Sequence, residues 1–289
     1  MAAAAPAVKT RLRMHAASEG VALIDKVQRL AFFSRLLWPT TRNALQWAEL
    51  QRGNRVLDLG CGNGHATLGL ASFVGRVGRI TGVDTSAKAL ESAAAYVQQN
   101  RDEDAMARVS FLKAEIPNNM AELANKRFDL VYSRLLFSYV PEPLASLETC
   151  KELLWPGGRI LVEDVDYSSS FCYPSSPAFD RYKELHTAIS AQLKGHPLIG
   201  PKLYSMVKEA GFVDARVRVV QPVFTHADEG RAVARASLQD IRNQVLAHDL
   251  ASESELAELD HQLRELEHRP DALISLPRIF QVTARVPTP

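Results

Sequence analysis

The sequence predicts an α/β fold, a Rossmann-like three-layer α/β/α sandwich built around a mostly parallel sheet. Short apolar runs of strand length alternate with stretches of helical periodicity. A glycine-rich turn follows the first of these runs, and acidic residues stand where several of them end. Strands that are separated by helices form βαβ units, which place their parallel strands in one sheet.

The first part of the chain predicts two helices ahead of the sheet. Residues 19–37 and 41–50 carry apolar side chains at helical spacing, and Pro39 separates the two stretches. Residues 1–18 are rich in alanine and are expected to form a flexible tail; a targeting segment is the alternative interpretation.

The central part of the chain alternates strictly between the two patterns. Five strands are expected at residues 55–60, 79–84, 109–115, 128–134 and 159–166. The helices between them are expected at residues 65–74, 86–100 and 143–154, with Ser86 as an N-cap and a turn at residues 155–158.

The last third of the chain is less regular. It predicts helices at 176–195 and 200–212, a sixth strand at 215–224, charged helical sequence at 228–267 and a last strand at 278–286. We expect one domain over residues 19–289, with N-terminal helices in 19–51 and substrate-cap insertions near 167–199 and 228–270. The charged helices predict a lid or a dimer surface.

Composition narrows the possible functions. Hydrophobic residues make up 46% of the chain, enough for a substantial core, and the net charge of +1 gives no long-range attraction to nucleic acid or to an anionic membrane. No apolar run is long enough to span a membrane. The three cysteines, Cys61, Cys150 and Cys172, are widely spaced, so we expect neither a disulfide framework nor a zinc site, and a cytoplasmic location.

The turn after the first strand is the most informative motif. In "VLDLGCGNG" (56–64), Gly60, Gly62 and Gly64 stand at alternate positions. The dinucleotide-binding pattern needs its third glycine at the position of His65, and the Gly-Lys-Ser/Thr of a phosphate loop is missing. The turn therefore favours a ligand without phosphates, with an NAD(P)-dependent oxidoreductase as the alternative.

Two acids next to this turn suggest which ligand it holds. Asp58 would repel a pyrophosphate and suits an ammonium group. Asp84 ends the second strand, where an acid can accept hydrogen bonds from both hydroxyls of a ribose. S-Adenosylmethionine has a ribose and an ammonium group but no phosphate.

At this point the chain resembles the class I S-adenosylmethionine-dependent methyltransferases, in particular the ubiquinone/menaquinone and natural-product types. The resemblance covers roughly residues 20–225. It is carried by "VLDLGCGNG", "GRITGVDTS", "FDLVYSRLLFSYVPEP" and "LLWPGGRILVEDVD". It implies a seven-stranded sheet with an antiparallel last strand, which residues 278–286 would supply.

The resemblance also implies a set of cofactor-binding residues. The turn would line the methionine part of the cofactor, with Asp58 near its amino group, and Asp84 would hold the ribose. The residues after the third strand would flank the adenine. The end of the fourth strand would face the methionine part through its backbone. These residues are Asp58, Gly60, Cys61, Gly62, Gly64, Asp84, Thr85, Ser86, Ala114, Glu115, Ile116, Ser133 and Arg134. The family more often has Asp-Ala where this chain has Ala114-Glu115.

Candidates for acceptor chemistry lie farther along the chain. His186 in the inserted helix could serve as a general base. Glu163, Asp164 and Asp166 end the fifth strand, where one of them could position or deprotonate the acceptor; Tyr139 and Tyr167 could contact it. The residues predicted to take part in catalysis are His186, Glu163, Asp166 and Tyr139. Transfer from an activated sulfonium needs alignment and exclusion of water more than a base, so none of these residues is required to act as one.

The acceptor is expected to be a small molecule. The fourth strand is followed by "SRLL" where nucleic-acid amino-methyltransferases have an Asn/Asp-Pro-Pro-aromatic motif, and Ser133 stands where a catechol-type metal site needs an acid, so no metal is expected. Aromatic residues suggest an enclosed apolar pocket or a core: Phe137, Tyr139, Phe171, Tyr173 and Phe179. We expect O-, N- or C-methylation of an apolar or aromatic metabolite in specialised metabolism, by a monomer or homodimer. The alternatives are a quinone-pathway C-methyltransferase and a non-catalytic binding protein.

Overall fold

The computed structural model describes residues 26–119 and 122–289. A seven-stranded sheet has the order β3-β2-β1-β4-β5-β10-β7, in which β10 runs antiparallel to both of its neighbours. Its strands are β1 (Arg55–Leu59), β2 (Arg79–Asp84), β3 (Arg108–Lys113), β4 (Phe128–Arg134), β5 (Leu154–Asp166), β7 (Val213–Val220) and β10 (Arg278–Arg285). The predicted fold class is confirmed.

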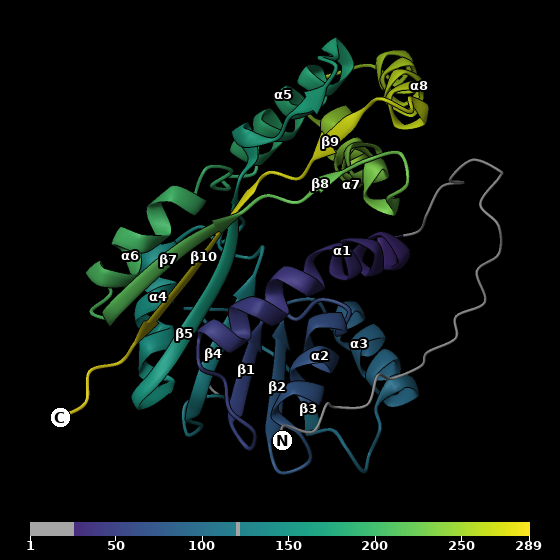
Figure 1. Cartoon of the computed structure of the whole chain (residues 1–289). Coiled ribbons are helices and arrows are strands. Elements are labelled where there is room, and N and C mark those ends of the chain that lie inside the picture. Colours follow the sequence, from purple (N-terminus) through teal and green to yellow (C-terminus); the bar gives the residue numbers. More distant parts are fainter. Residues whose placement is uncertain (1–25, 120–121) are drawn as a thin grey trace.

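Helices cover both faces of this sheet (Figure 1). Leu57, Val131 and Ile160 face a core shared with α4 and α6, whereas Val56, Ile80 and Leu130 face a core shared with α1 and α2. These opposite directions follow from the alternation of side chains along a strand. The helices are α1 (Lys26–Trp47), α2 (His65–Val74), α3 (Ala87–Asn100), α4 (Pro143–Glu152) and α6 (Leu203–Glu209).

A second body of structure, the cap, lies beyond the carboxyl ends of the parallel strands (Figure 1). It has its own apolar core. It consists of α5 (Pro177–Gln192), α7 (Val233–Ala247), α8 (Glu253–His268) and a small sheet of β6 (Cys172–Tyr173), β9 (Leu273–Ser275) and β8 (Val223–Phe224). The predicted insertions are thus helical as expected, but the small sheet was not anticipated.

The prediction of two N-terminal helices separated by Pro39 is wrong over the described residues. Pro39 lies inside one helix, α1, although a proline in a helix interior removes a backbone hydrogen bond. The Arg134 guanidinium donates to Ser34 Oγ at 3.0 Å and to Thr41 Oγ1 at 3.3 Å, and so ties together the turns on both sides of Pro39. The predicted tail, and the beginning of the first predicted helix, lie outside the described residues.

Two further boundaries differ from those predicted. The expected turn at residues 155–158 belongs to β5, where it produces a register shift against β4. The expected strand at 215–224 is divided after Val220, because Pro222 has no N–H for a continuing ladder and the chain leaves for the small sheet as β8. Within the described part of the chain, no helix is long and apolar enough to cross a membrane.

Candidate functional site

The glycine turn joins β1 to α2 at the point where the strand order of the sheet reverses, between β1 and β4. Gly60, Gly62 and Gly64 all have positive φ, at 73°, 52° and 81°. A Cβ on Gly64 would lie 3.0 Å from Ala93, and one on Gly60 would lie 3.0 Å from Leu136. A Cβ on Gly62 would meet nothing within 4 Å. Two of the glycines thus permit close packing, while Gly62 borders open space.

Asp84 is fixed beside this turn. Its Oδ2 accepts the backbone N–H of Gly62 at 3.0 Å, and its Oδ1 accepts that of Ser86 at 2.9 Å. Ser86 in turn caps α3, accepting the N–H of Ala89, as predicted, whereas the side chain of Thr85 is exposed. A carboxylate oxygen can accept more than one hydrogen bond, so the half-buried Asp84 retains capacity for two hydroxyls.

Asp58 is almost completely buried at the end of β1. Burial raises the pKa of its carboxyl group to about 6, against the opposing effects of a 2.5 Å hydrogen bond from Thr67 Oγ1 and of the Arg134 charge. An ammonium group brought next to Asp58 would favour its ionised form. The structure therefore presents a carboxyl group that changes its charge close to neutral pH.

This pKa predicts a pH dependence of cofactor binding. The affinity for S-adenosylhomocysteine should fall as the pH drops below about 6, because protonated Asp58 no longer attracts the ammonium group. Well below that pKa we expect a loss of about tenfold per pH unit. Calorimetry from pH 5 to pH 8 measures the profile, with Asp58→Asn as the control. Identical profiles for the wild type and Asp58→Asn would assign the pH dependence to another group.

The remaining predicted cofactor residues lie along the same edge of the sheet. Ala114 and Ile116 are buried after β3, and the Ala114 N–H donates to the carbonyl of Asp84 at 3.3 Å. The Glu115 side chain is exposed, while its backbone pairs with Asn119. Cys61 is buried; its sulfur lies toward Gly82 in β2, so only its backbone borders the turn.

The end of β4 adds a feature that the sequence did not suggest. Ser133 is buried and its Oγ has no hydrogen-bond partner within the described residues. The guanidinium of the following Arg134 has two neutral hydroxyl partners, and its charge is close enough to lower the pKa of Asp58. An anionic group beside Asp58 would find in Arg134 a cation that has no carboxylate partner among the described residues.

Arg134 is accordingly expected to bind the carboxylate of the methionine part. Arg134→Leu should weaken S-adenosylhomocysteine binding by at least about tenfold, since hydrogen bonds to charged groups contribute about 1.5–3 kcal/mol. Binding of 5′-methylthioadenosine, which lacks the amino-acid carboxylate, should not change. Equal losses for the two ligands in calorimetry would mean that Arg134 acts only by holding α1.

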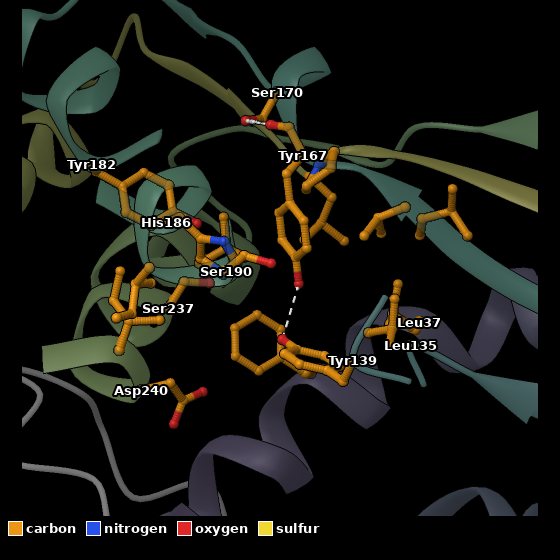
Figure 2. A pocket seen from close by; sticks show the side chains of 18 of the residues that line it. Leu37, Leu135, Tyr139, Tyr167, Ser170, Tyr182, His186, Ser190, Ser237 and Asp240 are labelled. Atoms are coloured by element: carbon orange, nitrogen blue, oxygen red, sulfur yellow. Dashed lines mark hydrogen bonds between the residues drawn. The ribbon is translucent and has the colours of Figure 1, made fainter. Parts of the chain in front are cut away.

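A cavity of about 380 Å³ lies next to this edge, between α1, the ends of β4 and β5, and the cap (Figure 2). Its aromatic lining consists of Phe33, Tyr139, Tyr167, Phe179 and Tyr182. Of the aromatic residues predicted to enclose a pocket, only Tyr139 and Phe179 line it. Phe137 belongs to the core shared with α4, and Phe171 and Tyr173 are exposed side chains outside the lining.

Two of the four predicted catalytic residues line this cavity. The hydroxyl groups of Tyr139 and Tyr167 point toward one another at 3.4 Å (Figure 2). The His186 ring lies against Tyr167, with 4.0 Å between ring centroids, and its buried Nδ1 has no hydrogen-bond partner within the described residues. Burial lowers the pKa of His186 to about 4, so the imidazole is neutral at physiological pH.

The other two predicted catalytic residues are engaged elsewhere. Glu163 accepts hydrogen bonds from Thr41 at 2.7 Å, Tyr132 at 2.7 Å and Gln281 at 2.5 Å, and so fastens α1 to β4 and β10. Asp166 accepts from the N–H and hydroxyl of Ser168 and caps a short turn. Neither lines the cavity, because Glu163 is held by donors from α1, β4 and β10 and Asp166 by its own turn.

Sequence reasoning also missed the polar contribution of α7. Ser237, Asp240 and Gln244 line the cavity, and Asp240 pairs with Arg29 of α1 at 2.5 Å. Their spacing of three and four residues places them on one helix face, which is a signal that the sequence did contain. Among the described residues there is no group of three or more His, Cys, Asp or Glu side chains that could hold a metal ion.

Comparisons with known proteins show which proteins this chain resembles. A family model described as a methyltransferase domain matches residues 50–211. The chain is 25% identical to an uncharacterized methyltransferase of Schizosaccharomyces pombe over 75% of this chain and 79% of the relative, and 29% identical to an arsenite methyltransferase of Aquipseudomonas alcaligenes over 59% and 47%. Phosphoethanolamine N-methyltransferase 2 of Haemonchus contortus, solved with S-adenosyl-L-methionine, shares the fold with a TM-score of 0.55 at 19% identity, covering 93% of this chain and 61% of that one.

Proposed function

Because the chain belongs to the class I S-adenosylmethionine-dependent methyltransferases, we propose that it methylates a small, uncharged acceptor with an aromatic or otherwise apolar body. The cavity beside the cofactor edge carries this proposal. Its volume of about 380 Å³ suits a small metabolite, and its walls are mostly apolar and aromatic.

The charge of the cavity argues against an anionic acceptor. Within the described residues, neither Lys nor Arg lines it, and its only carboxylate, Asp240, is paired with Arg29. A phosphate or carboxylate group in this cavity would be desolvated without a cation beside it, which is costly. This supports an acceptor that is neutral where the cavity holds it.

The lining of the cavity also argues against the substrates for which two of the similar proteins are named. Phosphoethanolamine carries a phosphate, for which no Lys or Arg of the described residues is available in the lining. Arsenite contains As(III), a soft Lewis acid that binds thiolates, but no cysteine of the described residues is part of the lining, and burial raises the pKa of the Cys61 thiol. A quinol ring, the reduced and nucleophilic form of a quinone, belongs by contrast to the proposed acceptor class.

The cofactor, when bound, supplies a methyl group activated by its sulfonium. The residues proposed to contact it fit such a ligand: Gly62 borders open space, and the buried Ser133 hydroxyl has no hydrogen-bond partner in the part of the chain that the structure describes. The segment that follows Arg134 leads to the acceptor cavity, because Leu135 and Tyr139 both line it. The proposed role of the protein is to align the acceptor and exclude water. Whether O, N or C is methylated stays open.

His186 is proposed to position the acceptor as a neutral hydrogen-bonding group rather than to act as a strong base. His186→Phe should preserve the packing against Tyr167 and lower turnover at least tenfold, with unchanged S-adenosylhomocysteine affinity. His248→Phe, an exposed site outside the cavity, is the matched control. Full turnover by His186→Phe would remove this residue from the proposed mechanism.

A methyl-transfer assay with an acceptor panel tests the proposed function. Labelled S-adenosylmethionine is incubated with neutral phenols, arylamines and quinols, and in parallel with benzoates, phosphoethanolamine and arsenite. We expect turnover only in the neutral set. Turnover restricted to the anionic compounds or to arsenite would overturn the acceptor class while leaving the methyltransferase assignment intact.

The cellular setting is part of the proposal. All three cysteines are free, which suits a reducing compartment and supports a cytoplasmic enzyme. An apolar cavity under a large cap suits specialised metabolism. We propose a monomer or homodimer that does not act on nucleic acid.

A further inference from the structure

Three arginines lie side by side at the amino ends of the parallel strands, the end of the sheet opposite the proposed cofactor site. Arg55, Arg79 and Arg108 are the first residues of β1, β2 and β3, and the register pairs Arg79 with both of the others. Paired residues of parallel strands project from the same face, and neighbouring strands are about 4.8 Å apart. Three exposed guanidinium groups therefore share one face of the sheet.

The face of the sheet that carries these three arginines is not covered by a helix of the described chain, which leaves a hollow beside them. The connection from β3 to β4 contains only turns and an isolated bridge in residues 114–119 and 122–127, so no helix of the described chain covers the face there. A cavity of about 350 Å³ results. Its polar lining is formed by the three arginines, Lys126, Thr81 and Ser110, and its apolar lining by Ile80, Val109 and Phe128. Thr81 and Ser110 lie two residues beyond Arg79 and Arg108, and their hydroxyl oxygens are 3.5 Å apart.

The charges in this hollow are not balanced from within the described chain. Among the described residues, no side chain forms an ion pair or hydrogen bond with the cationic groups of the three arginines or of Lys126. Asp129, an acid beside Arg55, accepts the backbone N–H of Arg55 rather than its guanidinium. Like charges on adjacent strands repel one another, and an anion held between them would relieve that repulsion.

We propose that this hollow, lined by Arg55, Arg79, Arg108 and Lys126, binds a small anion that carries two or more phosphate groups. Guanidinium groups hold phosphate oxygens by paired hydrogen bonds, and the two hydroxyls add further donors. The hollow is separate from the methyl-transfer site, because Arg79 and Asp84 occupy opposite ends of β2, about 17 Å apart at 3.3 Å per residue. The acceptor cavity, which no Lys or Arg of the described residues lines, and this basic hollow thus lie at opposite ends of the parallel strands.

Calorimetric titration with inorganic tripolyphosphate tests this site. We expect binding to the full chain at low ionic strength, weakened by salt, with at least tenfold loss in Arg79→Gln and in Arg108→Gln. Arg76→Gln is the matched control, because Arg76 is an exposed arginine near β2 that does not line the hollow. Saturating S-adenosylhomocysteine should leave tripolyphosphate binding unchanged.

Three results would overturn the proposal. These are absence of binding at low salt, equal losses in Arg76→Gln and Arg79→Gln, and competition with S-adenosylhomocysteine. Tighter binding of a single-stranded oligonucleotide, lost in the same variants, would assign the hollow to nucleic acid instead of a small anion. The acceptor assay contains no polyphosphate and does not depend on this hollow, so this proposal and the proposed function fail independently.

Discussion

Asp84→Ala should weaken the binding of S-adenosylhomocysteine by about 100-fold. The substitution removes a carboxylate placed to accept from both ribose hydroxyls, and hydrogen bonds to charged groups contribute about 1.5–3 kcal/mol each. The loss should extend to 5′-methylthioadenosine, which retains the ribose, and in this respect Asp84→Ala should differ from Arg134→Leu. Calorimetry with both ligands measures the effect.

The control for Asp84→Ala is another acid that organises a turn by the same means. Asp102 accepts the backbone N–H groups of Asp104 and Ala105, much as Asp84 accepts those of Gly62 and Ser86. Asp102→Ala should therefore reproduce the local structural loss and leave cofactor affinity unchanged. Wild-type affinity in Asp84→Ala would remove Asp84 from the ribose site.

Gly62→Ala is expected to abolish most cofactor affinity through the Cβ alone. The added methyl group would project into space that is open in the structure, where we place the methionine part of the cofactor. We expect a loss of at least tenfold in S-adenosylhomocysteine affinity, together with about 1–2 kcal/mol of stability from the positive φ. Calorimetry and denaturant unfolding measure the two effects separately.

Gly53→Ala separates backbone strain from ligand contact. Gly53 also has positive φ, at 88°, and a Cβ there would make only an ordinary contact with Val77 at 3.4 Å. It should lose comparable stability and bind the cofactor normally. Equal affinity in Gly62→Ala and Gly53→Ala would show that the open side of the turn does not hold the ligand.

The sequence predicted the fold and the cofactor edge because both depend on local signals. The alternation of strands and helices specified a parallel sheet, and Gly60 to Gly64 marked a turn whose residues are consecutive in the chain. Asp84 could be placed beside that turn because the ends of neighbouring parallel strands meet at one edge of the sheet.

The sequence could not show what depends on partners distant in the chain. Glu163 is at the strand end where it was predicted. Its carboxylate, however, accepts hydrogen bonds from donors on α1, β4 and β10, which hold it away from the cavity. Arg134, almost a hundred residues away, likewise bridges the turns of α1 on both sides of Pro39. Lone arginines gave no basic block in the sequence, yet strand register gathers three of them.

One calorimetric experiment tests most directly where the cofactor binds. The wild-type protein and Asp84→Ala are titrated in parallel with S-adenosylhomocysteine, 5′-methylthioadenosine and NAD. We expect the wild type to bind the first two ligands, with S-adenosylhomocysteine tighter, and to give no heat with NAD, while Asp84→Ala loses affinity for both. Binding of NAD, or S-adenosylhomocysteine affinity that survives in Asp84→Ala, would contradict the assignment of the Gly60–Gly64 turn and Asp84 as the cofactor site.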